Sequence, residues 1–558
     1  MLLSRRSFLF ATAAAIPLVL WAGENVDLFA VNRIRTEAFS NSKVMDTMFY
    51  LTDVYGPRLT NSPNYKAAGD WAVKRLQEFG LVNVKEEKWG PFGKGWETKY
   101  YEGHMVEPRF YSLNGIPLAW TSGTSGSVTG EAMMATLRTD ADMEKYKGKL
   151  KGKIILTSLP REMALPTEAE GKRYSDAELA DMATAPEPGR LPFGAAPTPL
   201  TRGQRAGAGG QQPVMSREER MKMQAKITEF MKNEGVLLSL TESTNGDGGT
   251  IFVASGGSYD PKAAEAVASV ALMPEQYNRI ARLLEHDIPV KLEFNIQNEF
   301  HNDDPDCFNI TGEIPGTGPH KDELVMLGAH FDSWHGGTGA TDNGAGSAVM
   351  MEAVRVLKAT NLPLDRTVRI GLWGGEEEGL LGSRAYVKEH FGDRETMKLT
   401  SEHAKLSGYF NYDNGTGKIR GVYLQGNDMM RPIFEAWLAP FKDLGASTIT
   451  IKNTGGTDHQ SYDAVGLPGF QFIQDPLDYE TRTHHSNMDV YDRLQAGDLM
   501  QASAIIASFA YNTANRSEML PRKPLPKPGA GGFGGGSRNR QSTDAGAPGG
   551  GRPAGGTQ

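Results

Sequence analysis

The stretch Glu323-Leu324-Val325-Met326-Leu327-Gly328-Ala329-His330-Phe331-Asp332-Ser333 decides the fold of this 558-residue chain. Its apolar run predicts a buried strand that ends at His330. A helix is expected over residues 346–359, a strand over 366–373, a helix over 378–390 and a strand over 406–412. Strands that alternate with helices predict an α/β fold, with a mostly parallel mixed sheet covered by helices on both faces.

Acidic residues and histidines follow the ends of these apolar runs or lie in a nearby glycine-rich turn. Ligands of such sheets gather beyond the carboxyl ends of the strands, so these side chains are expected to share one site. Imidazoles and carboxylates are the ligands that a catalytic zinc ion takes, and five ligands with one shared would suit two metals. The candidates are His330, Asp342, Glu376, Glu377, Asp413 and His485.

The neighbours within this set suggest a division of roles. Asp332, two residues after His330, would fix the tautomer of that imidazole. Glu376 and Glu377 are adjacent, and neighbouring side chains on an extended backbone point apart, so one would be a ligand and the other a general base. Two ordinary explanations remain open. Asp342 could cap the following helix, and the glutamates could be exposed acids at a helix N-terminus.

Together these motifs resemble the co-catalytic di-zinc aminopeptidase family, which includes bacterial leucyl aminopeptidases and plasma glutamate carboxypeptidase. The resemblance rests on Gly-Ala-His330-Phe-Asp332-Ser, Gly-Ala-Thr-Asp342-Asn-Gly-Ala-Gly, Glu376-Glu377-x-Gly379-Leu-x-Gly382-Ser383, Asn-Tyr-Asp413 and His485-Ser-x-x-Asp489. It is strong over residues 300–515. The fold that it implies is the zinc exopeptidase fold.

The resemblance implies two zinc ions and assigns the site residues. One zinc would be held by His330, Asp342 and Asp413, and the second by Asp342, Glu377 and His485, with Asp342 bridging. Glu376 would be the general base and Asp332 would orient His330. His484 leaves open which of the two adjacent histidines binds metal, although the spacing of the motif favours His485. The peptide bond between Asp342 and Asn343 is expected to be cis.

The implied activity is hydrolysis of peptide bonds at chain ends or in dipeptides. Asp458, His459 and Tyr462 resemble a motif that lines the substrate pocket of the family, and a loop-stabilising role is the alternative. The segment 115–299 resembles a β-rich α+β protease-associated insert. Its strands and the helix after Ser216 are expected to wall the metal site, so that only chain ends enter.

Two other functions share this fold. A glutaminyl cyclase would use one zinc, and a receptor-like homologue would lack the ligands; the complete ligand set argues against both. The resemblance leaves a homodimer open. The net charge is −8 and no basic stripe occurs, so a nucleic-acid partner is not expected. The single cysteine, Cys307, excludes an internal disulfide.

Both ends of the chain have distinctive compositions. Ser4-Arg5-Arg6-Ser7-Phe8-Leu9 precedes a short apolar run and looks like a twin-arginine signal, which predicts a periplasmic or secreted protein. Membrane contact is expected only if that segment stays uncleaved. The Gly- and Pro-rich end predicts disorder. The expected organisation is a signal over 1–30, a catalytic domain over 31–114 and 300–520, the insert over 115–299, and a tail over 521–558.

Overall fold

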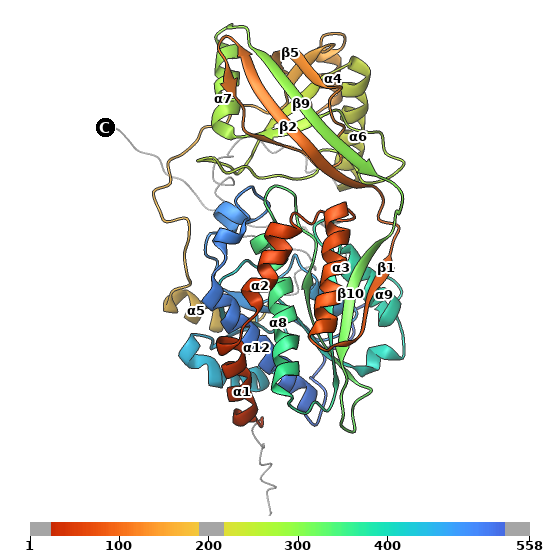
Figure 1. Cartoon of the computed structure of the whole chain (residues 1–558), viewed down its shortest axis with the longest axis vertical. Coiled ribbons are helices and arrows are strands. Elements are labelled where there is room, and N and C mark those ends of the chain that lie inside the picture. The colour runs from red at the N-terminus through yellow and green to blue at the C-terminus, as the bar shows by residue number, and fades with distance from the viewer. Residues whose placement is uncertain (1–23, 189–216, 530–558) are drawn as a thin grey trace, which may run out of the picture.

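The computed structural model describes residues 24–188 and 217–529, which form two units with one eight-stranded sheet each (Figure 1). The main unit contains residues 24–94 and 302–529. The inserted unit contains residues 95–301, and in Figure 1 it lies above the main unit. Each unit has its own hydrophobic core, because the two sheets are covered by different helices.

The sheet of the main unit is mixed, with parallel strands at its centre. Strands β12, β11, β15 and β18 pair in parallel, whereas β1, β10 and β12 pair antiparallel at one side. Its order is β1 (Val82–Trp89), β10 (Cys307–Ile314), β12 (Thr367–Trp373), β11 (Leu324–His330), β15 (Leu406–Asn411), β18 (Gly469–Gln474), β16 (Ile419–Tyr423) and β17 (Thr448–Thr450). The predicted mixed α/β architecture is confirmed.

Strand β11 is central because both of its faces are buried. Successive side chains of a strand point to opposite faces. Val325 and Leu327 therefore pack in the cluster that includes helices α8 (Ala345–Thr360) and α12 (Ala496–Asn515), and Met326 packs on the other side with α9 (Leu381–His390) and α11 (His459–Asp463). A strand buried on both faces reads as a continuous apolar run, which is why the sequence predicted it.

The N-terminal helices complete one face of the main unit. Helices α1 (Leu28–Ser40) and α2 (Val44–Phe49) contact α8, and α3 (Pro63–Glu78) contacts β1 and β10. Asp27 caps α1, Ala30 is fully buried and Glu24 pairs with Arg516 at 3.1 Å. The expected signal boundary at residue 30 therefore lies inside this unit, and residues 1–23 lie outside the described ranges. No helix in those ranges is long and apolar enough to cross a membrane.

The inserted unit starts earlier than the sequence suggested. Strand β2 (Gly95–Glu107) pairs along its length with β9 (Lys291–His301), so the boundary expected at 115 falls inside the unit and its end lies at His301 rather than 299. Residues 95–107 mix polar and aromatic residues without a clear strand pattern, so the sequence did not mark them as the start of the insert. The sheet order is β3 (Tyr111–Ser112), β2, β9, β5 (Ser127–Met134), β6 (Lys153–Leu156), β7 (Leu238–Glu242), β8 (Ser269–Leu272) and β4 (Gly115–Pro117).

Helices cover both faces of this second sheet. On one face, α7 (Pro274–Glu285) packs on alternate residues of β6, Ile154 and Leu156. On the other face, α6 (Arg217–Glu234) packs against Ile155, beside α4 (Asp140–Tyr146). The helix that follows Ser216 thus belongs to the core of the inserted unit.

One segment of the insert crosses back to the main unit. Helix α5 (Asp176–Ala183) contacts β17, and Figure 1 shows it beside the main unit although the strand before it lies in the inserted one. Arg173 anchors it by ion pairs to Asp475 at 2.8 Å and to Asp498 at 2.7 Å. The composition did not predict this crossing. The stretch 185–213 is crowded with Pro, Gly and Ala, a composition that predicts an irregular loop, and it lies mostly outside the described residues.

The first residues of the predicted disordered tail are ordered. The Arg522 guanidinium donates to the carbonyl oxygen of Leu406 at 2.7 Å, and Lys523 pairs with the buried Asp463. The cationic side chains of residues 522 and 523 thus hold residues 521–529 against the main unit. The Gly- and Pro-rich composition gave no indication of these contacts. The remainder of that prediction, residues 530–558, lies outside the described ranges.

Candidate metal centre and active site

The predicted ligands come together at the carboxyl ends of the central strands. β11 ends at His330, β12 ends three residues before Glu376, and β15 ends two residues before Asp413. Parallel strands end at the same edge of the sheet, so their following residues meet there. Asp342 lies in the turn before α8. The peptide bond between Asp342 and Asn343 is cis, which confirms the prediction.

One group of three side chains could hold a cation. His330 Nε2 lies 3.2 Å from Asp342 Oδ1 and 3.5 Å from Asp413 Oδ1. All three residues are buried. An imidazole and two carboxylates that converge in this way offer three oxygen and nitrogen donors to one zinc ion.

A second group forms on the other oxygen of the same aspartate. His485 Nε2 lies 3.1 Å from Asp342 Oδ2 and 2.9 Å from Glu377 Oε2. The two carboxylate oxygens of Asp342 therefore face different histidines, His330 and His485. A carboxylate placed between two ligand groups is suited to bridge two cations.

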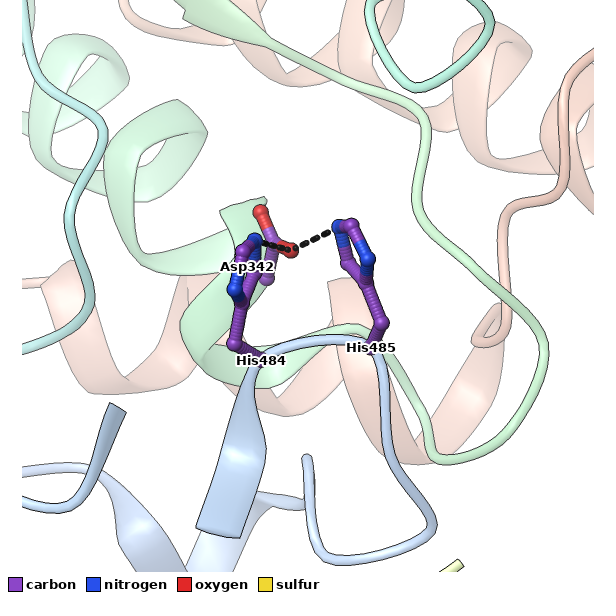
Figure 2. Close-up of side chains that lie close together, drawn as sticks. All are labelled: Asp342, His484 and His485. Atoms are coloured by element: carbon purple, nitrogen blue, oxygen red, sulfur yellow. Dashed lines mark ion pairs between the residues drawn. The ribbon is translucent and has the colours of Figure 1, made fainter. Parts of the chain in front are cut away.

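His484 lies beside the second group. Its Nε2 is 3.7 Å from Asp342 Oδ2, and its Nδ1 is 3.7 Å from Glu480. Figure 2 shows Asp342 between the two imidazoles, with both histidines turned toward its carboxylate. His485 has two shorter contacts, to Asp342 and Glu377, so the geometry favours His485 as the ligand and leaves His484 next to it.

The donor set fits a metal. Within the described ranges, no hydrogen bond reaches the buried Glu377 Oε1, and lone pairs of this kind can be satisfied by a cation. Burial raises the pKa of Glu377, and the carboxylate of Asp342 adds to that shift. Burial opposes ionisation of Asp342 too, but hydrogen bonds from His330 and His485 hold its pKa well below the usual range. Carboxylates this close together repel one another, and a bound cation would offset that repulsion.

Comparisons with known proteins agree with this site. Residues 309–510 match the profile of peptidase family M28. These residues therefore form a zinc metallopeptidase region that is similar to family M28. Carboxypeptidase Q of Mus musculus is 25% identical over 481 residues, which cover 85% of this chain and 86% of that protein. Aminopeptidase YwaD of Bacillus subtilis is 30% identical over 217 residues, 38% of this chain and 45% of that protein.

Solved structures share the fold of this chain. A peptidase M28 precursor from Shewanella amazonensis has a TM-score of 0.61 at 24% identity, and the match covers 89% of this chain and 98% of that one. A zinc aminopeptidase from Bacillus subtilis has a TM-score of 0.51 at 19% identity, with 85% and 95% covered. Both matches extend over the main and the inserted units.

The carboxylate of Asp332 acts on more than His330 in this site. The imidazole Nδ1 of His330 contacts the backbone oxygen of Asp332 at 3.0 Å, whereas the carboxylate is 3.7 Å away. That carboxylate instead accepts from the backbone N–H groups of Glu376 at 3.2 Å and Glu377 at 3.3 Å, and from the Thr60 hydroxyl at 2.9 Å. Asp332 thus fixes both the imidazole and the two glutamates.

Glu376 lies at the edge of the ligand cluster with the environment of a base. Burial raises the pKa of Glu376 well above its usual range, and the carboxylates of Asp413 and Asp458 raise it further, while His330 opposes them. A general base works best when its pKa lies near the working pH. In the described part of the chain its side chain joins neither His330 nor His485 in an ion pair, unlike Asp342 and Glu377.

The predicted substrate residues separate into different environments. The carboxylate of Asp458 is fully buried, and among the described residues neither of its oxygens has a hydrogen-bond partner. Burial raises the pKa of Asp458 to about 7. His459 Nε2 instead lies 3.1 Å from the Thr454 carbonyl oxygen, an internal contact that fits the loop-stabilising alternative.

Tyr462 belongs to the hydrophobic core. It is fully buried, and its ring stacks on Tyr409 at 4.0 Å between centroids. Its hydroxyl contacts the Met326 sulfur at 3.8 Å. No face of this ring is open to a substrate, so the expected pocket role does not fit. The position of Tyr462 shortly after Asp458 is therefore explained by its packing in the hydrophobic core.

Sequence reasoning missed Asp489 and Arg58. The Asp489 carboxylate accepts from the backbone N–H groups of Thr341 and Asp342, which fixes the bridging carboxylate. Arg58 is fully buried and donates to the carbonyl oxygens of Phe331 at 2.7 Å and Gly339 at 2.9 Å. Asp489 belongs to the motif His485-Ser-x-x-Asp489, so its spacing from His485 was a signal that could have identified its role. The sequence around Arg58 contains no comparable signal.

Proposed function

We propose that this chain is a di-zinc exopeptidase that splits dipeptides or removes residues from chain ends, as the names of its carboxypeptidase and aminopeptidase relatives suggest. The observation that carries the proposal is the position of Asp342, whose two oxygens face His330 and His485 at 3.2 and 3.1 Å. His330, Asp342 and Asp413 would hold one zinc, and Asp342, Glu377 and His485 the other.

The residues of the chain supply the proton transfers. When bound, zinc would act as a Lewis acid that polarises the substrate carbonyl and acidifies water. Glu376 accepts the proton of the attacking water at its carboxylate and then delivers it to the leaving amine. Asp332 keeps Glu376 in place by accepting from its backbone N–H at 3.2 Å. The buried surroundings exclude bulk water and strengthen each of these interactions.

The inserted unit would restrict the site to chain ends, as a protease-associated domain would. Two of its loops, residues 117–120 and 247–253, support this role. Trp334 lies 6.0 Å from the His485 ring and 6.1 Å from the Trp120 ring, and His335 Nε2 contacts the Pro117 carbonyl oxygen at 2.7 Å. We propose that these loops form the wall that was expected from the strands of the insert and the helix after Ser216.

Zinc content and substrate length together test the function. Purified protein loaded with zinc should hold two ions per chain by elemental analysis, and it should hydrolyse free dipeptides or aminoacyl fluorogenic substrates. One ion per chain, with cyclisation of N-terminal glutamine, would support the glutaminyl cyclase alternative. Efficient internal cleavage of an unfolded protein would contradict the exopeptidase assignment.

The cellular setting is part of the proposal. The twin-arginine pattern at Arg5 and Arg6 supports export to the periplasm or the medium. Because residues 24–30 pack in the main unit, cleavage would have to occur before Glu24. Mass spectrometry of the exported protein would locate the new N-terminus, and a start after residue 30 would contradict this.

A further inference from the structure

The turn that carries His484 and His485 is held by both units. The helical turn Tyr479–Thr483 leads into these histidines. From the inserted unit, the Val253 N–H donates to the His485 carbonyl oxygen at 2.9 Å, and Ile251 accepts from the Asn487 N–H at 3.0 Å. A β-bridge also joins Phe252 and Ser486. The backbone of the second ligand group therefore pairs with residues 251–253 of the inserted unit.

Arg482 is the side chain that fastens this turn. Its guanidinium makes two hydrogen bonds to the Glu170 carboxylate, at 2.5 and 2.8 Å. It also pairs with Asp247 at 2.9 Å and donates to the Thr250 hydroxyl at 2.5 Å. A two-point bond between arginine and carboxylate fixes orientation as well as distance. Glu170, Asp247 and Thr250 all come from the inserted unit; together with Arg482 they are called the latch.

The latch is connected to the histidines through the backbone. The carbonyl oxygen of Arg482 accepts from the Ser486 hydroxyl, which closes the chain around His484 and His485. A cavity of about 620 Å³ borders the latch on the side of Glu170 and Arg493, and none of the ligand residues lines it. The contacts of the latch therefore reach the candidate ligands through the backbone of the turn.

The first ligand group has no such dependence. His330 is fixed by the Asp332 carbonyl oxygen at 3.0 Å and by the Ser347 hydroxyl, which donates to the His330 carbonyl oxygen at 2.7 Å. All of these residues belong to the main unit. The two halves of the site thus differ in what supports them, and they can be perturbed separately.

We infer that Arg482 is a positioning residue for His485, through which the inserted unit sets the zinc affinity of the His485 half of the site. The inference rests on the proposed assignment of two metals. Residues that orient metal ligands typically change metal affinity by about 10- to 100-fold when they are replaced. Loss of the latch should therefore weaken the second zinc by about that factor and leave the first unchanged.

The test compares zinc binding with the latch intact and broken. Variants Arg482→Gln, Glu170→Gln and Arg482→Lys are titrated with zinc against a chelating dye, and bound zinc is counted by elemental analysis. The matched controls are Arg369→Gln and Glu313→Gln, which break a similarly buried pair near the start of β12 and the end of β10, at the edge of the sheet opposite the ligands. Circular dichroism and thermal unfolding confirm that each variant is folded.

The expected result is a selective change in the second binding step. Arg482→Gln and Glu170→Gln should bind the first zinc as the wild type does and the second about 10- to 100-fold more weakly. Arg482→Lys, which keeps the charge but not the two-point geometry, should fall between. Raised free zinc should restore activity to Arg482→Gln, and the folding measurements and the Arg369→Gln control separate this rescue from general destabilisation.

Three outcomes overturn the inference. One is wild-type affinity for both zinc ions in Arg482→Gln and Glu170→Gln. Another is equal weakening of both steps, and the third is an equal effect in the Arg369→Gln control. A wild-type protein that binds only one zinc would instead refute the proposed two-metal function, so the two failures are distinguishable.

Discussion

Replacing Glu376 by Gln should abolish most activity while the zinc content stays at the wild-type level. The amide has nearly the same size, and the Glu376 side chain is not in the close contacts that join His330, Asp342, Glu377 and His485. What it loses is the ability to accept a proton. General-base catalysis contributes about 10²–10⁴-fold, which corresponds to about 2.7–5.4 kcal/mol in the activation free energy.

Glu377→Gln is the matched variant, because it makes the same chemical change one residue away. Glu377 Oε2 lies 2.9 Å from His485 Nε2, within the second ligand group. A neutral amide there should lower the zinc content toward one ion per chain as well as the activity. Both variants would be assayed by kcat and KM on a dipeptide and by elemental analysis of zinc. Equal zinc loss in the two variants, or zinc loss in Glu376→Gln alone, would refute the division of roles between the neighbouring glutamates.

Three further predictions concern other residues. Asp332→Asn should lower kcat by about 10- to 100-fold with KM little changed, because the charged acceptor for Glu376 and Glu377 is lost; steady-state kinetics checks this, and a wild-type kcat would contradict it. His485→Ala should lose zinc by elemental analysis, whereas His484→Ala should retain it; the reverse result would exchange their roles. Burial lowers the pKa of His335 to about 4, so this histidine is neutral when folded and protonates more easily when unfolded. Its contribution to stability should fall as pH drops from about 6.5 toward 4, by up to about 3 kcal/mol; thermal unfolding of His335→Asn should show a shallower pH slope than the wild type.

The central strands of the main unit and the candidate ligands at their ends were predictable for a physical reason. A strand buried on both faces must be apolar throughout, so a polar residue such as His330 marks its end. Parallel strands then bring those ends together without any knowledge of tertiary contacts. This reasoning located His330, Glu376, Glu377 and Asp413 correctly. It could not place Tyr462, because stacking on Tyr409 depends on a neighbour 53 positions away that no local pattern identifies.

The start of the inserted unit was predicted wrongly because its first strand, unlike β11, is only half buried. Strand β2 is polar on its exposed positions and pairs with β9, nearly two hundred residues later. A half-exposed strand gives a weak signal, and its partner can be anywhere in the chain. The same applies to Glu170, which lies in a stretch without regular structure and gains its role only by contact with Arg482.

The inserted unit holds the turn of His485, whereas among the described residues only those of the main unit hold His330. This difference has a thermodynamic consequence for the peptidase. If the inserted unit favours the His485 position that binds zinc, then zinc at that position must favour the docked inserted unit by the same free energy. The contacts involved are specific: Val253 with the His485 carbonyl oxygen, and Glu170 with Arg482. The unit that is proposed to limit substrate length would then be held in place by the second metal. A chain that lost this metal would lose both a catalytic ion and part of the wall that excludes longer peptides.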